Sequence, residues 1–127
     1  MLTDFSRLCL HTMTTKPLTL AEAVHTYVRA DVRAITVWRQ HIEPIGAKEA
    51  GKILRDAELS VASLCRGGFF PAFSKADRQK AIDENRRAID EAAEIGAPLV
   101  VLVCGAVPGM PLHDAREDRP HLRRRHP

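Results

Sequence analysis

Short apolar runs alternate with helically spaced apolar stripes along most of the chain. The runs are bounded by polar, glycine or proline residues, which is typical of strands. They predict four strands, at Leu8–Leu10, Ala34–Trp38, Val61–Cys65 and Leu99–Val103. The last run is uniformly apolar, which predicts a strand that is buried on both faces.

Three apolar stripes with helical spacing separate these runs. They predict helices over Leu20–Ala30, Ala47–Ala57 and the segment from Ser74 to Gly96. Thr19 and Glu22 have the spacing of a capping box, and Ser74 has the residue type of a helix cap. The stripe of the third helix contains Asn85 among apolar residues. We interpret this residue as a packed amide with satisfied hydrogen bonds rather than as a catalytic group.

The order of the predicted elements is β-α-β-α-β-α-β, which is the pattern of a parallel sheet with helices outside it. Each helix leads into the next strand through a short turn, at Asp31, Glu58 and Gly96. Glycine adopts the left-handed conformation of such a turn freely and aspartate tolerates it. Glu58 there would cost about 1 kcal/mol.

Length and charge limit the classes of function. The 127 residues are enough for one hydrophobic core, so we expect one domain. The net charge is +3, but residues 114–127 contain five arginines and three acids and therefore carry most of it. The remaining surface is nearly neutral and aromatic residues are few, so we expect no nucleic acid partner.

The three cysteines include no CxxC pair. The first residues lack the pattern of a secretory signal, and no run is long enough to cross a membrane. We therefore expect a cytoplasmic protein without a membrane partner, in which Cys9, Cys65 and Cys104 are free thiols that pack as small hydrophobic residues.

Chemically capable side chains gather where the predicted strands end. The carboxyl ends of parallel strands share one edge of a sheet, so these side chains are expected to converge there. Arg39 and Arg66 are the main candidates for binding a polar substrate, because a guanidinium is a planar fork of donors. Trp38 offers an apolar face to a sugar ring, although a tryptophan at this position is also typical of a core. The candidate substrate-binding residues are His11, Trp38, Arg39, His41 and Arg66.

Other chemistries find little support. Histidines and cysteines at the strand ends include ligand types for zinc, but their spacings are long and irregular, so we expect no metal site. No phosphate-binding glycine loop and no GxSxG nucleophile motif is present. Glu43 follows the second strand without an identifiable carboxylate partner. We therefore assign no catalytic residue.

Several segments together resemble a known family. They include Trp-Arg-Gln-His at positions 38–41, Cys-Arg-Gly-Gly-Phe-Phe-Pro at 65–71, Asn-Arg-Arg-Ala-Ile-Asp-Glu-Ala at 85–92 and Leu-Val-Cys-Gly at 102–105. In order and spacing the chain resembles the N-terminal half of sugar phosphate isomerases and epimerases of the xylose isomerase-like TIM-barrel superfamily.

The resemblance implies a partial (β/α)8 TIM barrel over residues 1–113, with about four βα units and a sheet in the order 1-2-3-4. Residues 114–127 form an Arg/His/Pro-rich tail that we expect to be disordered or frame-shifted. Members of the family use a divalent metal to move protons beside the carbonyl of a sugar or polyol. Their metal ligands come from later strands, so we expect a truncated, inactive fragment that binds no metal.

Other functions remain open at this stage. A dehydratase or an abasic-site endonuclease of the same superfamily is one alternative. A small binding module with a flavodoxin-like sheet is another, and its strand order would differ. A third is a non-catalytic half barrel whose open edges lead to a homodimer or to aggregation.

Overall fold

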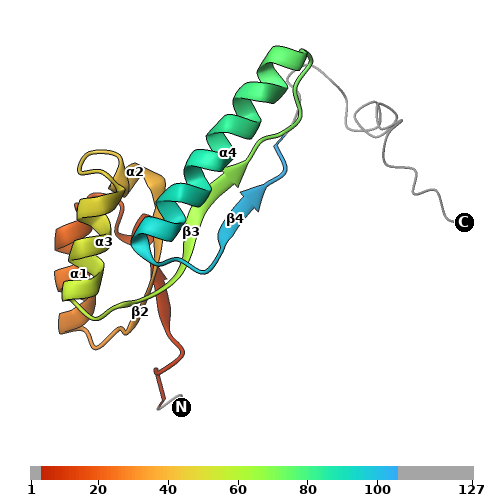
Figure 1. The fold of residues 1–127 in the computed structure, drawn as a ribbon. Helices are drawn as coiled ribbons and strands as arrows, with labels where there is room; N and C mark the ends of the chain where they lie inside the picture. The colour runs from red at the N-terminus through yellow and green to blue at the C-terminus, as the bar shows by residue number, and fades with distance from the viewer. Residues whose placement is uncertain (1–3, 106–127) are drawn as a thin grey trace, which may run out of the picture.

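The computed structural model of the chain describes residues 4–105. Its elements follow the predicted alternation of strands and helices (Figure 1). In chain order they are β1 (Cys9–His11), the 3-10 helix η1 (Thr12–Thr15), α1 (Leu20–Arg29), β2 (Ala34–Trp38), α2 (Arg39–Ile42), α3 (Ala47–Asp56), β3 (Ser60–Gly68), α4 (Lys75–Ile95) and β4 (Val100–Val103). The predicted tail at residues 114–127 lies outside the described residues.

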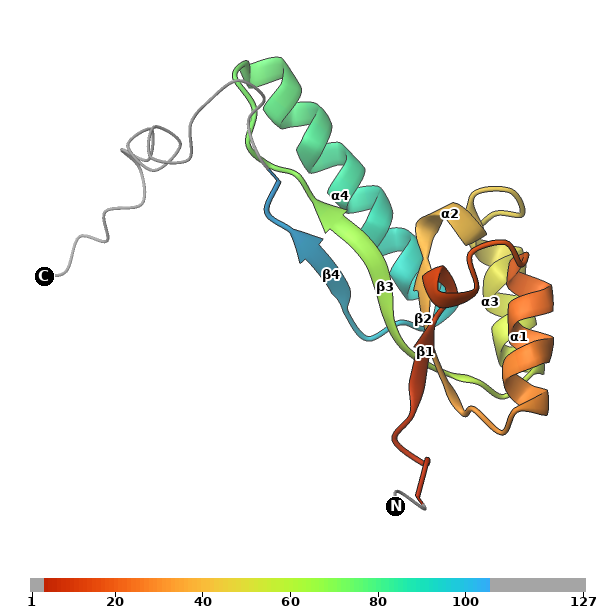
Figure 2. The same ribbon diagram turned by 180° about the vertical axis from the view of Figure 1, so that it is seen from behind.

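The four strands form one parallel sheet in the order β1-β2-β3-β4. The predicted order is confirmed, and a flavodoxin-like order is wrong because β1 lies at an edge. The views from opposite sides show α1, α3 and α4 on one side of the sheet, with the other side uncovered (Figure 2). This arrangement is an arc of a (β/α) barrel, with the helices outside and the bare face inside.

The predicted signals at the helix ends are confirmed. The Thr19 side chain and Glu22 form a complete capping box at the start of α1, and the Ser74 hydroxyl accepts the Asp77 N–H at the start of α4. Gly96 ends α4 in the left-handed conformation. Asp31 and Glu58 both adopt φ of 54°, as the repeated helix-to-strand turn requires.

The core lies between the helices and the outer face of the sheet. Its largest fully buried apolar side chains are those of Leu20, Tyr27, Ile35, Val37, Leu54, Leu64 and Ile95. Ile35 and Leu64 come from the central strands, and the others come mainly from the buried faces of the helices. Burial of these side chains fixes which strand residues face outward, and therefore which face the barrel interior.

Strand β3 is longer than the sequence predicts. Pairing continues through Gly67 and Gly68, which lie opposite Leu102 and Val103 of β4, instead of stopping at Cys65. At Gly68, with φ of 103°, a Cβ atom would lie 2.0 Å from the Val103 carbonyl oxygen. The glycine pair therefore allows a close strand contact rather than ending the strand.

The residues after β2 also differ from the prediction. They form the single helical turn α2 in place of a loop, and the Glu43 N–H donates to the Arg39 carbonyl at 2.9 Å. The turn buries His41 and Ile42. Burial of these two side chains explains why the segment leaves the strand as a compact turn.

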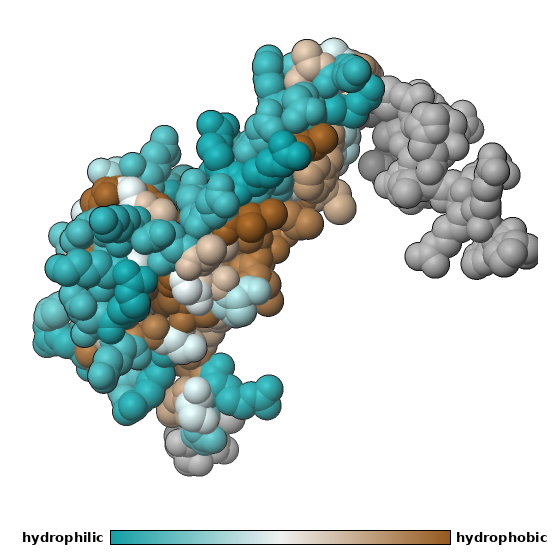
Figure 3. All heavy atoms as spheres, viewed as in Figure 1, coloured by the Kyte–Doolittle hydropathy of each residue, from teal (hydrophilic) through white to brown (hydrophobic). Residues whose placement is uncertain are grey.

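The prediction that the fourth strand is buried on both faces is wrong. Leu102 is 58% exposed, and Val101 is also exposed. On α4, Ile82 and Ile89 of the predicted apolar stripe are exposed as well. Brown, hydrophobic residues gather along the β4 side of the molecule below α4 (Figure 3). An apolar run shows that the side chains of a strand are suited to pack against other apolar groups. Whether those side chains are exposed depends on which elements lie beside the strand.

Helix α4 is held closely against α3. At Gly51 a Cβ atom would lie 2.5 Å from the Glu94 carbonyl oxygen, so the two helices approach at a distance that only glycine permits. The Arg55 guanidinium donates to the same carbonyl at 3.0 Å. This contact fixes the C-terminal end of α4, which carries the acids described below.

Candidate functional site

The ends of β1 and β2 place two predicted site residues in direct contact. The Trp38 indole N–H donates to His11 Nδ1 at 3.2 Å. Because the indole nitrogen is only a donor, His11 Nδ1 accepts, and the neutral ring carries its proton on Nε2. His11 is exposed and Trp38 is half-buried. The pair thus presents an N–H donor beside an aromatic ring at the carboxyl ends of β1 and β2. We call the region at the carboxyl ends of the strands the mouth of the arc.

A buried hydroxyl supports this pair from below. Thr12, which is fully buried, accepts the Trp38 backbone N–H at 3.0 Å and lies 3.2 Å from His41 Nδ1. The Tyr27 hydroxyl donates to the His11 carbonyl at 3.0 Å. His41 therefore lies behind the mouth, where it contacts Thr12, while His11 and Trp38 lie at its surface. No sequence pattern predicts the roles of Thr12 and Tyr27.

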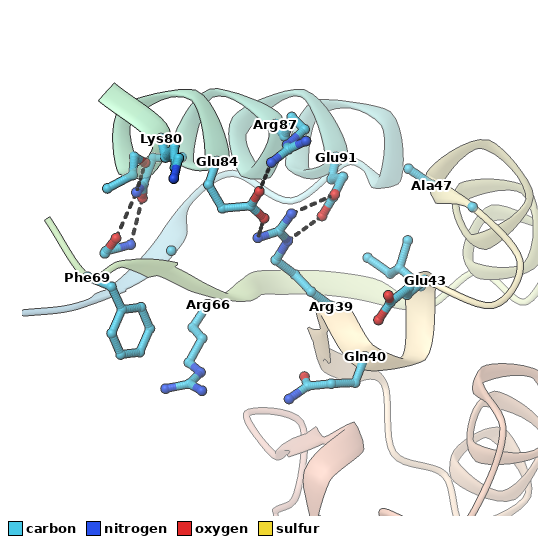
Figure 4. A pocket seen from close by; sticks show the side chains of 16 residues that line it. Arg39, Gln40, Glu43, Ala47, Arg66, Phe69, Lys80, Glu84, Arg87 and Glu91 are labelled. Carbon is cyan, nitrogen blue, oxygen red and sulfur yellow. Dashed lines mark hydrogen bonds and ion pairs between the residues drawn. The ribbon is translucent and has the colours of Figure 1, made fainter. Parts of the chain in front are cut away.

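Arg39 points away from the mouth. Its guanidinium binds Glu91 through two hydrogen bonds of 2.5 and 2.8 Å and pairs with Glu84 at 2.7 Å (Figure 4). These hydrogen bonds raise the pKa of Arg39 above its usual value, and the bond from Arg39 lowers the pKa of Glu84. Arg87 also pairs with Glu84. The Arg39 charge is thus neutralised by α4.

Sequence reasoning missed this cluster because acids on a helix are usually solvated. Their spacing contained a usable signal. Glu84 and Glu91 are seven residues apart, so they lie on one flank of α4, two turns from each other and next to its buried stripe. Two acids aligned with a buried face favour a cationic partner from a neighbouring element.

Asn85 fixes the end of β3. Its side-chain oxygen accepts the Gly68 N–H at 2.6 Å, and its side-chain nitrogen donates to the Gly68 carbonyl at 2.8 Å and to the Ala81 carbonyl at 2.8 Å. The predicted satisfied amide is confirmed. Because Gly68 lies between Arg66 and the following loop, Asn85 holds the backbone that presents Arg66.

Arg66 is exposed at the end of β3. Its guanidinium carbon lies 4.5 Å from the centre of the Phe69 ring, and within residues 4–105 the guanidinium makes no ion pair. In Figure 4 Arg66 and Gln40 point to the side opposite Arg39. Stacking on Phe69 orients the guanidinium plane while its N–H donors stay accessible.

An open cavity of about 990 Å³ lies between the end of β3, the α2–α3 connection and α4. Its wall includes Arg66, the Arg39 cluster and Lys80. Charges of both signs line it, and of its three acids Glu84 and Glu91 are paired with arginines. The free donors of the cavity wall are therefore concentrated near Arg66.

The residues at the mouth do not form a metal site. In the described part of the chain no cluster of three or more His, Cys, Asp or Glu side chains is arranged to hold a metal ion. The thiols are dispersed: Cys65 is buried, Cys9 is half-buried and Cys104 is exposed. The prediction that the cysteines are free thiols is confirmed, but the expectation that Cys104 is buried is wrong.

Over residues 4–105 no helix is long and apolar enough to cross a membrane.

Comparison with known proteins gives a family match and a similar solved structure. The model of the xylose isomerase-like TIM-barrel family matches residues 21–125. The crystal structure of protein SMc04130 from Sinorhizobium meliloti 1021 is similar, with a TM-score of 0.82 and 43% sequence identity over 91% of this chain. This chain covers 42% of that protein, which is less than half its length. No curated protein matches the sequence.

Proposed function

Because the chain belongs to the xylose isomerase-like TIM-barrel family, we propose that it forms the substrate-holding part of a sugar isomerase or epimerase site. The observation that carries the proposal is the Trp38–His11 pair, together with the accessible Arg66, which follows the strand partner of Trp38, Cys65. These groups suit a sugar or polyol. The indole stacks on C–H groups, His11 Nε2–H donates to a hydroxyl or carbonyl oxygen, and the guanidinium binds hydroxyl or phosphate oxygens.

Binding and chemistry are separate in this proposal. Proton transfer beside a carbonyl needs a general base and a group that stabilises the developing oxyanion. Residues 4–105 contain no metal-holding cluster to polarise the carbonyl. We therefore propose that the described residues bind and orient the substrate, and that isomerisation or epimerisation belongs to a complete barrel.

We also propose that the protein works in the cytoplasm. Its cysteines are free, and burial raises the pKa of the Cys65 thiol, which keeps this residue in its protonated, poorly reactive form. Free thiols persist where glutathione keeps them reduced.

Tryptophan fluorescence tests the binding step directly. Trp38 is the only tryptophan in the chain, so its emission reports on the mouth alone. We expect a saturable change in emission on titration with ketoses, aldoses and their phosphate esters. A complete lack of response to this panel would contradict the proposal. Incubation in D₂O with the best ligand should give no deuterium at the carbon beside the carbonyl, because the chain binds without turnover.

A matched pair of variants identifies the contribution of Arg66. Arg66→Met should weaken binding of the best ligand about 10-fold or more, since a charge-assisted hydrogen bond is lost. Arg33→Met is the control, because Arg33 is exposed before β2 and pairs with Asp31. Equal affinity losses in the two variants would mean that the effect comes from net charge and that Arg66 makes no specific contact.

A further inference from the structure

Seven of the twelve large apolar side chains that are exposed within residues 4–105 lie beside the two edge strands of the sheet. Beside β4 they are Ile82, Ile89, Leu99, Val101 and Leu102, which we call the β4 seam. Just before β1 they are Phe5 and Leu8, which we call the β1 seam. Each seam adjoins an edge strand whose outer backbone groups have no strand partner within the described part of the chain. Unpaired edges beside apolar surface are typical of a sheet that continues into another chain or segment.

The spacing of residues on α4 shows that its two flanks differ. Glu84 and Glu91 occupy the flank that faces Arg39 and β2. Ile82 and Ile89 are also seven residues apart but lie on the other side of the buried stripe, so they extend beyond β4. Figure 3 shows the hydrophobic surface along this side. The β4 seam is therefore continuous from helix to strand.

The curvature of the sheet limits which strand can pair with the outer edge of β4. Superposition on the solved relative covers 91% of this chain with a TM-score of 0.82, so the four strands have the curvature of a larger structure. In a closed barrel of parallel strands, the neighbour of β4 must run parallel to it. Strand β1 runs in that direction and has its outer edge free.

We propose that the β4 seam of one chain binds the β1 seam of a second copy, and the reverse, about a two-fold axis along the strands. A second copy fits because it carries the matching edge in the required direction, with apolar side chains beside it. Two-fold symmetry produces the contact between a β4 seam and a β1 seam twice. The two contacts together are expected to bury the roughly 1,200–2,000 Å² of surface that is typical of a stable interface. Eight strands close the arc, and each mouth residue, including Trp38 and Arg66, faces its counterpart across the barrel.

The mass of the full chain in solution is the first test. The monomer is 14.1 kDa, so light scattering at micromolar concentration should give twice this mass. A monomer, or a distribution of large aggregates without a dimer, would overturn the proposal. Sugar binding at the mouth is measured separately by Trp38 emission, so failure of the dimer and failure of the proposed function are distinguishable.

Charge substitutions locate the interface. The variants Ile89→Lys and Leu102→Lys should each raise the dimer dissociation constant about 100-fold, because an ammonium group is placed in an apolar seam. Ile45→Lys is the matched control, since Ile45 is also exposed but lies in the α2–α3 connection away from both seams. Circular dichroism of each variant distinguishes loss of the dimer from loss of the fold. If Ile45→Lys raised the dimer dissociation constant by the same factor, the assignment of the interface to the two seams would be contradicted.

Amide exchange distinguishes barrel closure from any other dimer. The edge amides of β1 and β4 should exchange more slowly as the protein concentration rises through the dissociation constant, and both strands should change together. The exposed Phe69, Phe70 and Phe73 form a competing apolar surface. Protection confined to that segment, with both sheet edges unprotected, would overturn the proposal in favour of a dimer through the aromatic residues.

Discussion

Arg39 and Arg66 directly follow Trp38 and Cys65, which are paired on neighbouring strands, yet the environments of the two arginines differ. Arg39 is largely buried against α4 and is bound by two carboxylates. Arg66 is exposed, stacks on Phe69 and makes no ion pair within residues 4–105. The first fastens a helix to the sheet, and the second presents donors at the mouth. Equivalent positions at the ends of adjacent strands therefore have different functions.

The direction of each side chain causes this difference. The Trp38 indole contacts His11 at the mouth. Arg39, the next residue, points toward α4 (Figure 4). Around Arg66 the register of β3 against β4 shifts, since pairing passes from Cys65 to Gly67. A register shift leaves one residue outside the regular alternation and redirects it. The arginine at this irregularity is the one that remains accessible.

Removal of the Arg39 guanidinium should have the largest effect on stability. Arg39→Met leaves Glu91 without its cationic partner and leaves Glu84 with Arg87 alone, which we expect to lower the free energy of unfolding by about 2 kcal/mol. Arg66→Met should change it by less than about 0.5 kcal/mol, because the side chain is exposed. Urea unfolding of both variants measures the contrast. Equal losses would show that the two arginines stabilise the fold to the same extent.

Loss of the Asn85 side chain should have a comparable or slightly smaller effect. Asn85→Ala leaves the buried N–H and carbonyl of Gly68 without partners, which costs about 1–2 kcal/mol. The Gly68 amide should also exchange faster, and this local readout separates loss of the contact from general destabilisation. Normal protection of Gly68 in the variant would contradict the role assigned to Asn85.

Acid should weaken the Arg39 cluster. Arg39 lowers the pKa of Glu84 below its ordinary value of 4.5, so the unfolded chain binds the proton first as the pH falls. The stability that this pair contributes is full above that value and is lost as the pH falls through the lower, folded pKa. Urea midpoints measured from about pH 6 to about pH 3 should fall less steeply in Arg39→Met than in the wild type.

A small effect on the fold is also expected from His11. His11→Phe removes the acceptor of the Trp38 indole N–H at an exposed position, so the free energy of unfolding should change by about 1 kcal/mol at most. The Trp38 emission maximum should shift because the hydrogen-bond partner of the indole is gone. Unchanged emission would mean that the two rings do not interact in solution.

Much of the fold was predictable because its signals are local. The capping box at Thr19, the turn at Gly96 and the alternation of runs and stripes each depend on neighbouring residues. The family resemblance added the strand order and the barrel geometry. Exposure of β4 was not predictable, because it depends on which element packs against the strand and not on the strand itself.

The candidate site was predictable by residue type but not by geometry. Convergence of the strand ends was correctly inferred for His11 and Trp38, which are in contact. The pairing of Arg39 with Glu91 crosses 52 residues, and no local pattern shows which arginine finds such a partner. Thr12 and Tyr27, which support His11 and Trp38, were missed because hydroxyl groups carry no distinctive spacing.

The strand order also determines how the chain is made on the ribosome. Each strand of the sheet pairs with the strand synthesised just before it. A newly emerged βα unit therefore finds its docking surface already present, and no segment waits for a distant partner to be translated. Among the strands of residues 4–105, only β1 and β4 keep an edge without a neighbouring strand. These two edges are therefore the parts of the newly made sheet where we expect a chaperone to bind.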